Sequence, residues 1–209
     1  MAKTHVFIDG FNLYYGAVRG TPYKWLDVSK MCGLLLPAHK IAKIRYFTAK
    51  VKSRPHDPDA PTRQQIYLRA LGTIPNLTIH LGQFLTHPVW MPDATSMSNP
   101  PRMLRVLKTE EKGSDVNLAT CLLLDGFQKS YDMAVLVTND SDLLEPIRAV
   151  RNVLGLQVGI LCPNAKASWV LRPPAVNFLK RIRAGVLASS QFPVQLTDAS
   201  GSFQKPKSW

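Results

Sequence analysis

Val135-Leu-Val-Thr-Asn-Asp-Ser-Asp142 is a short apolar run that ends abruptly in two carboxylates. A continuous Val/Leu run is typical of a parallel strand that is buried on both faces. In open α/β sheets, ligands bind just beyond the carboxyl ends of such strands. We therefore expect Asp140 and Asp142 at this edge of a sheet, where the next helix begins.

The start of the chain repeats this pattern. His5-Val-Phe-Ile-Asp-Gly-Phe-Asn12 reads as a strand that ends in Asp9, with Asn12 one turn further on. A third acid, Asp115, follows Lys112-Gly113-Ser114 and precedes the apolar segment 116–124. Three acidic strand ends or helix starts in one small α/β chain predict a site for a hard metal ion.

Composition places the chain among soluble globular proteins. Its 209 residues are 45% hydrophobic and 19% charged, which suits one domain with a sizeable core. No apolar run reaches membrane-spanning length, and the N-terminus turns polar at Asp9, so we expect a cytoplasmic protein without a membrane partner. Cys32, Cys121 and Cys162 are widely spaced in apolar segments, which favours core thiols in a reducing compartment.

The charge is the second strong signal. A formal net charge of +12 and a pI near 9.8 favour a polyanion as partner. A basic surface attracts phosphate, whereas an acidic pocket repels it unless divalent cations intervene. The sequence therefore predicts a protein that handles nucleic acid.

Strand-like and helix-like segments alternate along the chain, which favours an α/β fold with a central, mainly parallel sheet of about five strands flanked by helices. Strands are expected at residues 6–9, 41–51, 77–85, 132–138 and 156–162, and helices at residues 27–36, 62–71, 114–129 and 142–153. Residues 86–101 are expected to form a long loop, 102–109 an extended segment, and 164–184 a helical segment broken at Pro173-Pro174. We expect one domain over residues 1–185 and an extended, partly packed tail over residues 186–209.

The acids suit Mg²⁺ or Mn²⁺, which take oxygen ligands and need few carboxylates beside a substrate phosphate. Asn12, Thr138 and Ser141 are candidates for orienting substrate or neighbouring carboxylates. A structural alternative exists for each acid, because Asp142 or Ser141, and likewise Ser114 or Asp115, can cap the helix that follows. Asp142 alone favours the capping role, whereas the acids together favour a metal pocket.

Other catalytic schemes lack their motifs. The five histidines have no metal-ligand spacing with one another or with cysteine. There is no Gly-x-Ser-x-Gly elbow, no phosphate-binding Walker loop and no dinucleotide-binding Gly-x-Gly-x-x-Gly. Asp9-Gly10-Phe11-Asn12 stands where a Rossmann oxidoreductase has its glycines.

Three segments carry a family resemblance: IDGFNLYY in the first strand, KGSDVNLA, and VTNDSDLLEPI at the end of a later strand. Together, and in this order, they resemble the NYN domain family of the PIN-like nuclease superfamily, and the ending TDASGSFQKPKSW is similar to that of bacterial single-domain members. The resemblance implies a three-layer, Rossmann-like fold, RNA as substrate, and a Mg²⁺ or Mn²⁺ pocket formed by Asp9, Asp115, Asp140 and Asp142 beside Asn12. Asn139 is a departure, because the family often has Gly or Ser there.

The sequence thus predicts a metal-dependent ribonuclease that hydrolyses RNA phosphodiester bonds by in-line attack of water. Two alternatives remain: a non-catalytic RNA-binding module with a vestigial pocket, and a small-molecule enzyme such as a hydroxylase. RNA is the expected partner, and a homodimer stays open. Candidates for phosphate contact are Arg45, Lys50, Lys52 and Arg54 near the second strand, Lys108 and Lys112 before Asp115, and Arg172 near the C-terminal segment.

Overall fold

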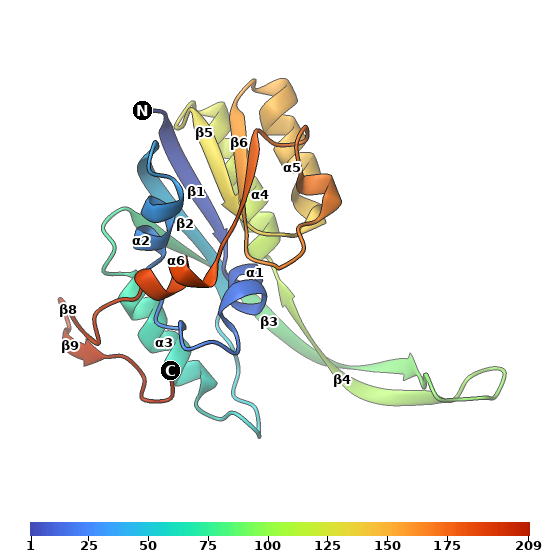
Figure 1. Cartoon of the computed structure of the whole chain (residues 1–209). Coiled ribbons are helices and arrows are strands. Elements are labelled where there is room, and N and C mark those ends of the chain that lie inside the picture. The colour runs from blue at the N-terminus through green and yellow to red at the C-terminus, as the bar shows by residue number, and fades with distance from the viewer.

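The computed structural model describes residues 1–209 and has a seven-stranded sheet in the order β4-β3-β2-β1-β5-β6-β7 (Figure 1). All neighbouring strands are parallel except β3 and β4. The strands are β1 (Lys3–Asp9), β2 (Lys40–Ala49), β3 (Leu77–Pro92), β4 (Met103–Lys112), β5 (Met133–Val137), β6 (Gln157–Cys162) and β7 (Phe178–Arg181). The helices are α1 (Gly10–Leu13), α2 (Val28–Leu35), α3 (Ala60–Leu71), α4 (Ser114–Phe127), α5 (Leu144–Arg148) and α6 (Ala184–Ser189).

The central strand β1 divides the core into two layers. Val6, Phe7 and Ile8 are fully buried, and because side chains alternate along a strand they point to opposite faces. Val6 and Ile8 pack with residues of α2, α3 and α6 on one face. Phe7 packs with residues of α4 and α5 on the other. The predicted three-layer α/β class is therefore confirmed.

The sheet has seven strands, because the edge strands β4 and β7 add to the five that were predicted. The helical segment predicted at residues 164–184 is wrong. Residues 164–184 contain only a short 3₁₀ turn at Trp169–Leu171, and Phe178–Arg181 form the edge strand β7 beside β6. β7 has only four residues, two of them basic, so its sequence shows no alternation of apolar and polar side chains. Its place in the sheet depends on Gly159 of β6, where an added Cβ would collide with the ring of Phe178.

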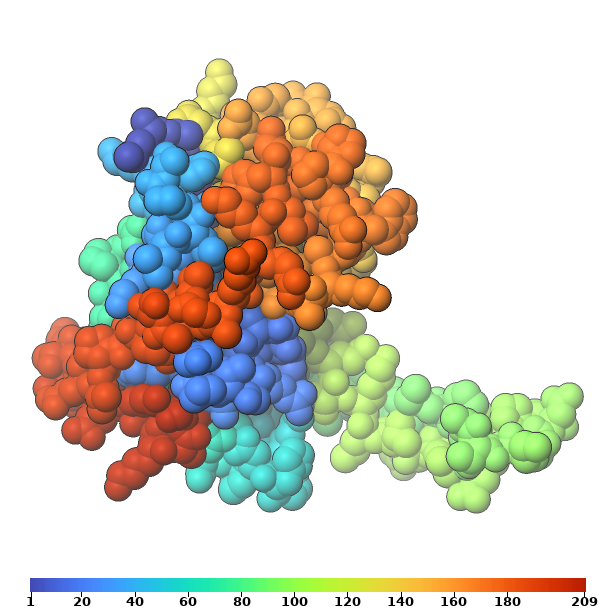
Figure 2. All heavy atoms as spheres, viewed as in Figure 1, coloured from blue at the N-terminus to red at the C-terminus, as the bar shows by residue number.

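The expected long loop at residues 86–101 is wrong in its first part, because residues 86–92 belong to β3. Gln83–Pro92 pair antiparallel with Met103–Lys112, and residues 93–102 connect the two strands at the tip. Figures 1 and 2 show this β3–β4 arm projecting well beyond the rest of the molecule. Exposure on both faces removes the alternation that identifies a half-buried strand, and the prolines Pro88 and Pro92 are tolerated because the strands of the ribbon are edges.

The last residues fold back onto the α3 side of the domain. β8 (Gln195–Asp198) and β9 (Gly201–Gln204) form a separate hairpin, which Arg69 of α3 holds through two bonds of 2.7 Å to the carboxylate of Asp198. The ring of Trp209 lies 5.8 Å from that of Tyr67. None of the helices combines the length and the apolar character that crossing a bilayer requires.

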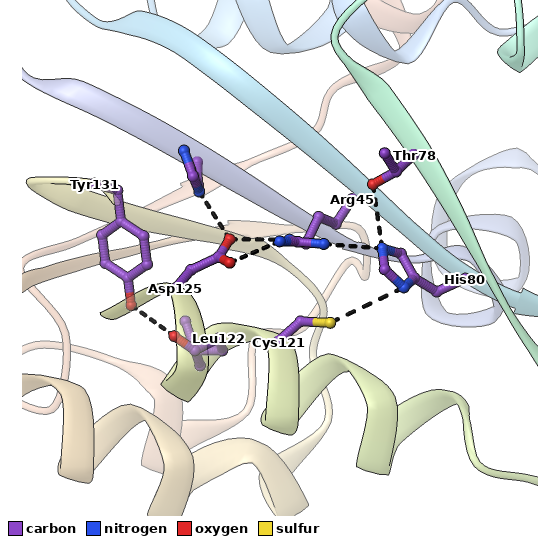
Figure 3. A network of polar contacts seen from close by, with 8 residues as sticks. Arg45, Thr78, His80, Cys121, Leu122, Asp125 and Tyr131 are labelled. Atoms are coloured by element: carbon purple, nitrogen blue, oxygen red, sulfur yellow. Dashed lines mark hydrogen bonds and ion pairs between the residues drawn. The ribbon is translucent and has the colours of Figure 1, made fainter. Parts of the chain in front are cut away.

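A buried ionic network ties α4 to the sheet (Figure 3). Asp125 of α4 is 4% exposed, and Arg45 of β2 donates to both of its carboxylate oxygens, at 2.9 and 2.6 Å. His5 Nδ1 of β1 lies 2.9 Å from Asp125 Oδ2. Burial raises the pKa of Asp125, but the hydrogen bonds from Arg45 and His5 outweigh burial and hold this pKa below its usual value. One carboxylate thus joins two strands to one helix.

Replacement of Asp125 by Asn should lower the free energy of unfolding by about 3 kcal/mol, because it leaves the partly buried Arg45 without its counter-charge. Urea denaturation followed by circular dichroism measures this change. The exposed Asp59 makes no ion pair, so Asp59→Asn is a matched control that should change stability by less than about 0.5 kcal/mol. Equal effects of the two substitutions would contradict a structural role for the network.

Candidate functional site

Three carboxylates meet at the carboxyl edge of the sheet. Asp9 ends β1, Asp140 follows β5, and Asp115 lies in the first turn of α4. One oxygen from each lies within 4.8 Å of the others. We call these residues the carboxylate cluster.

Asp9 is the buried member of the cluster, with 4% of its surface exposed. Its Oδ1 accepts the backbone N–H of Asn12 at 2.9 Å, which starts α1, and its Oδ2 accepts the hydroxyl of Thr138 at 3.3 Å. Burial raises the pKa of Asp9, against the lowering effect of the hydrogen bonds from Asn12 and Thr138. Asp9 is therefore fixed in position, and its charge is costly when no cation is near.

Asp140 is held by the turn that follows β5. Its Oδ1 accepts the backbone N–H of Asp142 at 3.0 Å, and its own N–H donates to Thr138 Oγ1 at 3.1 Å. The N–H of Asn139 donates to Asn12 Oδ1 at 3.1 Å, which joins this turn to the start of α1. Asp140, rather than Asp142 or Ser141, is thus the cap of the 3₁₀ turn Ser141–Leu143, and its second oxygen accepts no hydrogen bond.

Asp115 reaches the cluster from the other direction. Gly113 has a φ of 99°, a conformation that glycine adopts without strain, and it turns the chain from β4 into α4. Ser114 donates its hydroxyl to Glu111 at 2.7 Å, whereas the carboxylate of Asp115 accepts no hydrogen bond. Burial and then the charges of Asp9 and Asp140 raise the pKa of Asp115 to about 6.

The donor set fits a divalent cation that prefers oxygen ligands. Three carboxylates lie close together, the oxygens of Asp115 and one oxygen of Asp140 have no partner within the protein, and no histidine or cysteine belongs to the group. A like-charge cluster of this kind is relieved either by protonation or by a bound cation. After burial, the charges of Asp9 and Asp140 are the largest causes of the raised pKa of Asp115.

Asp142 and Ser141 are placed differently from the cluster. Both are exposed in the turn after Asp140, and Asp142 does not belong to the group whose oxygens converge. The charge of Asp142 still contributes to the raised pKa of Asp115. Thr138, by contrast, is fully buried between Asp9 and the backbone of Asp140.

The predicted phosphate-contacting residues do not form one surface. Arg45 is occupied by Asp125, and Lys108 of the arm lies 2.7 Å from Glu110, which is also 3.7 Å from Lys112. Arg172 donates to the carbonyl of Ala167 at 2.8 Å and lies beside a separate pocket. Lys50, Lys52 and Arg54 are free of ion pairs and follow β2 at the same edge as the cluster.

Sequence reasoning missed a pocket of about 440 Å³ that begins at Gly10, directly after Asp9. Its walls come from segments far apart in the chain, and its rim carries the side chains of Lys52 and Arg54. We call it the aromatic pocket; its rings include Phe11, Tyr46, Tyr67, Phe84 and Trp209. The aromatic residues near the first strand were a signal, but nothing in their spacing joins them to the last residue of the chain.

The chain is similar to known proteins in sequence and in fold. The model of the NYN domain family matches residues 3–187. The chain is 31% identical to 6-hydroxy-3-succinoylpyridine 3-monooxygenase HspA of Pseudomonas putida (strain DSM 28022 / S16), over 99% of this chain and 75% of that protein. It shares a fold with the crystal structure of a protein of unknown function from Vibrio parahaemolyticus RIMD 2210633, with a TM-score of 0.55, 14% identity, and coverage of 88% of this chain and 94% of that one.

Asp115→Asn should stabilise the cation-free protein at neutral pH. The pKa of Asp115 is raised from 3.8 to about 6, so its protonation stabilises the fold at pH 4 and this contribution is lost as the pH rises through 6. In EDTA at pH 7.5 we expect the variant to melt about 2–4 °C above the wild type, which is the shift that about 1 kcal/mol produces in a chain of this size. At pH 4 the melting temperatures of the two proteins should be close to each other.

Differential scanning fluorimetry at the two pH values measures this shift. Mn²⁺ should raise the melting temperature of the wild type by mass action and that of the variant much less. Asp59→Asn again serves as the control, and its melting temperature should equal that of the wild type at both pH values. A variant that melts below the wild type at pH 7.5 would show that Asp115 has a structural role instead.

Proposed function

This chain belongs to the NYN domain family, and we propose that it is a metal-dependent ribonuclease that hydrolyses RNA phosphodiester bonds. The observation that carries the proposal is the convergence of the carboxylate cluster within 4.8 Å at the carboxyl edge of the sheet. The net charge of +12 supports a polyanionic substrate. Family membership supports the nuclease-like fold and leaves the reaction itself to experiment.

In this proposal Asp9, Asp115 and Asp140 hold Mg²⁺ or Mn²⁺. Such an ion, when bound, polarises a phosphoryl oxygen and acidifies water. Thr138 fixes the carboxylate of Asp9, and Asn12 joins the two strand ends, so that the cluster keeps its shape. We place Asp142 and Ser141 at the outer side of the carboxylate cluster, where Asp142 adds negative charge.

The RNA backbone is proposed to approach across the segment that follows β2. Lys50, Lys52 and Arg54 lie there without ion pairs, at the edge where Asp9 ends β1. Lys112 stands just before the turn into α4, and Lys108 and Arg172 are more distant contributors. Cationic side chains at this edge would offset the repulsion between the carboxylates and a phosphate.

The first test is cleavage of a labelled single-stranded RNA with Mn²⁺, with Mg²⁺ and with excess EDTA. We expect cleavage only with a divalent ion, and a loss of about 100-fold or more in Asp140→Asn. This substitution keeps an acceptor oxygen for the N–H of Asp142, so the fold should be preserved. Asp9→Asn should behave alike, and Asp59→Asn should cleave as the wild type does.

Two outcomes would change the proposal. Cleavage that persists in EDTA or in both cluster variants would rule out the carboxylate mechanism. RNA that the wild type binds but leaves intact with either ion would favour a non-catalytic RNA-binding module instead.

A second candidate function is hydroxylation of a small heteroaromatic acid. It is favoured by the 31% identity to a 6-hydroxy-3-succinoylpyridine 3-monooxygenase over 99% of this chain, and by a pocket of about 440 Å³ beside the cluster. Pockets of this volume enclose small organic ligands. Such a hydroxylation consumes O₂ and two electrons, so it needs an external reductant.

The test supplies 6-hydroxy-3-succinoylpyridine, NADH and ¹⁸O₂, and follows the product by mass spectrometry. Hydroxylation requires that one oxygen atom from O₂ enters the product while NADH provides two electrons and the second atom leaves as water. We expect Asp140→Asn to abolish this incorporation if the cluster serves this reaction. If 6-hydroxy-3-succinoylpyridine stays unchanged while RNA is cleaved, the ribonuclease function is supported and the hydroxylase function is excluded.

A further inference from the structure

We propose that the aromatic pocket is a binding site for a single planar aromatic ring that carries an anionic group. The pocket holds about 440 Å³ between β2, α1, α3 and the C-terminal residue, and it begins at Gly10 beside Asp9. A nucleotide and a free aromatic carboxylate share this chemistry. The proposal rests on and deepens the functions above, since it specifies a ligand for the pocket that begins directly after Asp9.

The walls of the pocket are aromatic and come from five separate segments. Tyr46 and Tyr67 have ring centroids 6.5 Å apart, and Trp209 lies 5.8 Å from Tyr67 in an edge-to-face arrangement. Phe11 and Phe84 form a second pair at 5.7 Å. Ring faces and edges at these distances leave a lining that favours a flat π-system over an aliphatic chain.

Two of the tyrosine hydroxyls differ in their partners. Tyr67 donates its hydroxyl to the carbonyl of Leu26 at 2.9 Å, which fixes the ring in the wall. The hydroxyl of Tyr46 has no hydrogen-bond partner in the protein, and it is not among the side-chain atoms that are both fully buried and unpaired. Because Tyr46 lines the pocket, its hydroxyl is accessible there to a polar atom of a ligand.

The rim of the pocket is cationic. Five basic side chains line it against one carboxylate, Asp57, and that carboxylate is already paired with Arg63. The remaining four are Arg19, Lys24, Lys52 and Arg54, and none of them forms an ion pair within the chain. An aromatic site with unpaired cations at its mouth attracts an anion attached to the ring.

Trp209 makes the site sensitive to the tail. The residue is at position 209, where its ring packs on Tyr67, and the β8–β9 hairpin before it is anchored to Arg69 by Asp198. Loss of its ring would remove one wall without disturbing the sheet. Trp169, which is 80% exposed and lies outside the pocket, offers a matched control of the same residue type.

The experiment measures binding by isothermal titration calorimetry with the full chain in EDTA, so that it is independent of any metal chemistry. Four probes are used: adenosine 5′-monophosphate, nicotinate, adenosine and inorganic phosphate. We expect at least one of the two aromatic anions to bind at least tenfold more tightly than either adenosine or phosphate. The Kd for that anion should rise about tenfold in Trp209→Ala, as expected for loss of one stacking partner, and remain unchanged in Trp169→Ala.

The charge requirement has its own pair of variants. Lys52→Glu should raise the Kd for the aromatic anion about tenfold and make this Kd less dependent on salt. Arg105→Glu on the distant arm should change neither the Kd nor its salt dependence. Tighter binding of the nucleotide assigns the pocket to a base of a nucleic acid, and tighter binding of nicotinate assigns it to a free aromatic acid. Either result supports the site.

The proposal is overturned if phosphate alone binds as well as the aromatic anions, or if Trp209→Ala, with its melting temperature unchanged, binds as the wild type does. Failure of RNA cleavage or of hydroxylation with a divalent ion would leave these binding results untouched. Binding without turnover and turnover without ring binding are therefore distinguishable outcomes.

Discussion

The constraint on which the site depends is the reversal of strand order at the centre of the sheet. From β1 the chain continues outward to β2 and β3 on one side, whereas β5, β6 and β7 continue on the other. The connections leave β1 and β5 toward opposite faces, which opens a crevice beyond their carboxyl ends. Asp9 and Asp140 lie at the two sides of this crevice, so sheet topology rather than local sequence brings them together.

The same carboxylates also organise the backbone around them. Asp9 caps α1 and Asp140 caps the turn after β5, each with one oxygen. The second oxygen of Asp9 accepts the hydroxyl of Thr138, whereas the second oxygen of Asp140 accepts no hydrogen bond. Capping stabilises the turns, whereas burial, and after it the like charges of Asp9 and Asp140, raise the pKa of Asp115 to about 6. The site is thus rigid and electrostatically unfavourable at neutral pH, a combination that favours a bound cation.

Two chemistries are compatible with one architecture. The NYN domain family supplies the nuclease-like fold, and a relative that is 31% identical carries the name of a monooxygenase. Both activities would use the crevice at β1 and β5, and a fold alone does not specify which reaction occurs there. The aromatic pocket begins at Gly10, directly after Asp9, and in our proposal it binds the ring of the substrate.

The sequence by itself determined the α/β class, the buried strands around Val6–Asp9 and Val135–Thr138, and the acids at their ends, because burial on two faces produces apolar runs that stop at the edge. Only the tertiary structure decided which acids meet: Asp115 joins Asp9 and Asp140, whereas Asp142 lies in the turn after Asp140 and outside this group. The same holds for the exposed β3–β4 arm, for the edge strand β7 and for Trp209 in the pocket. These features depend on pairing and packing between segments far apart in the chain, and a local pattern of residues carries no information about such distances.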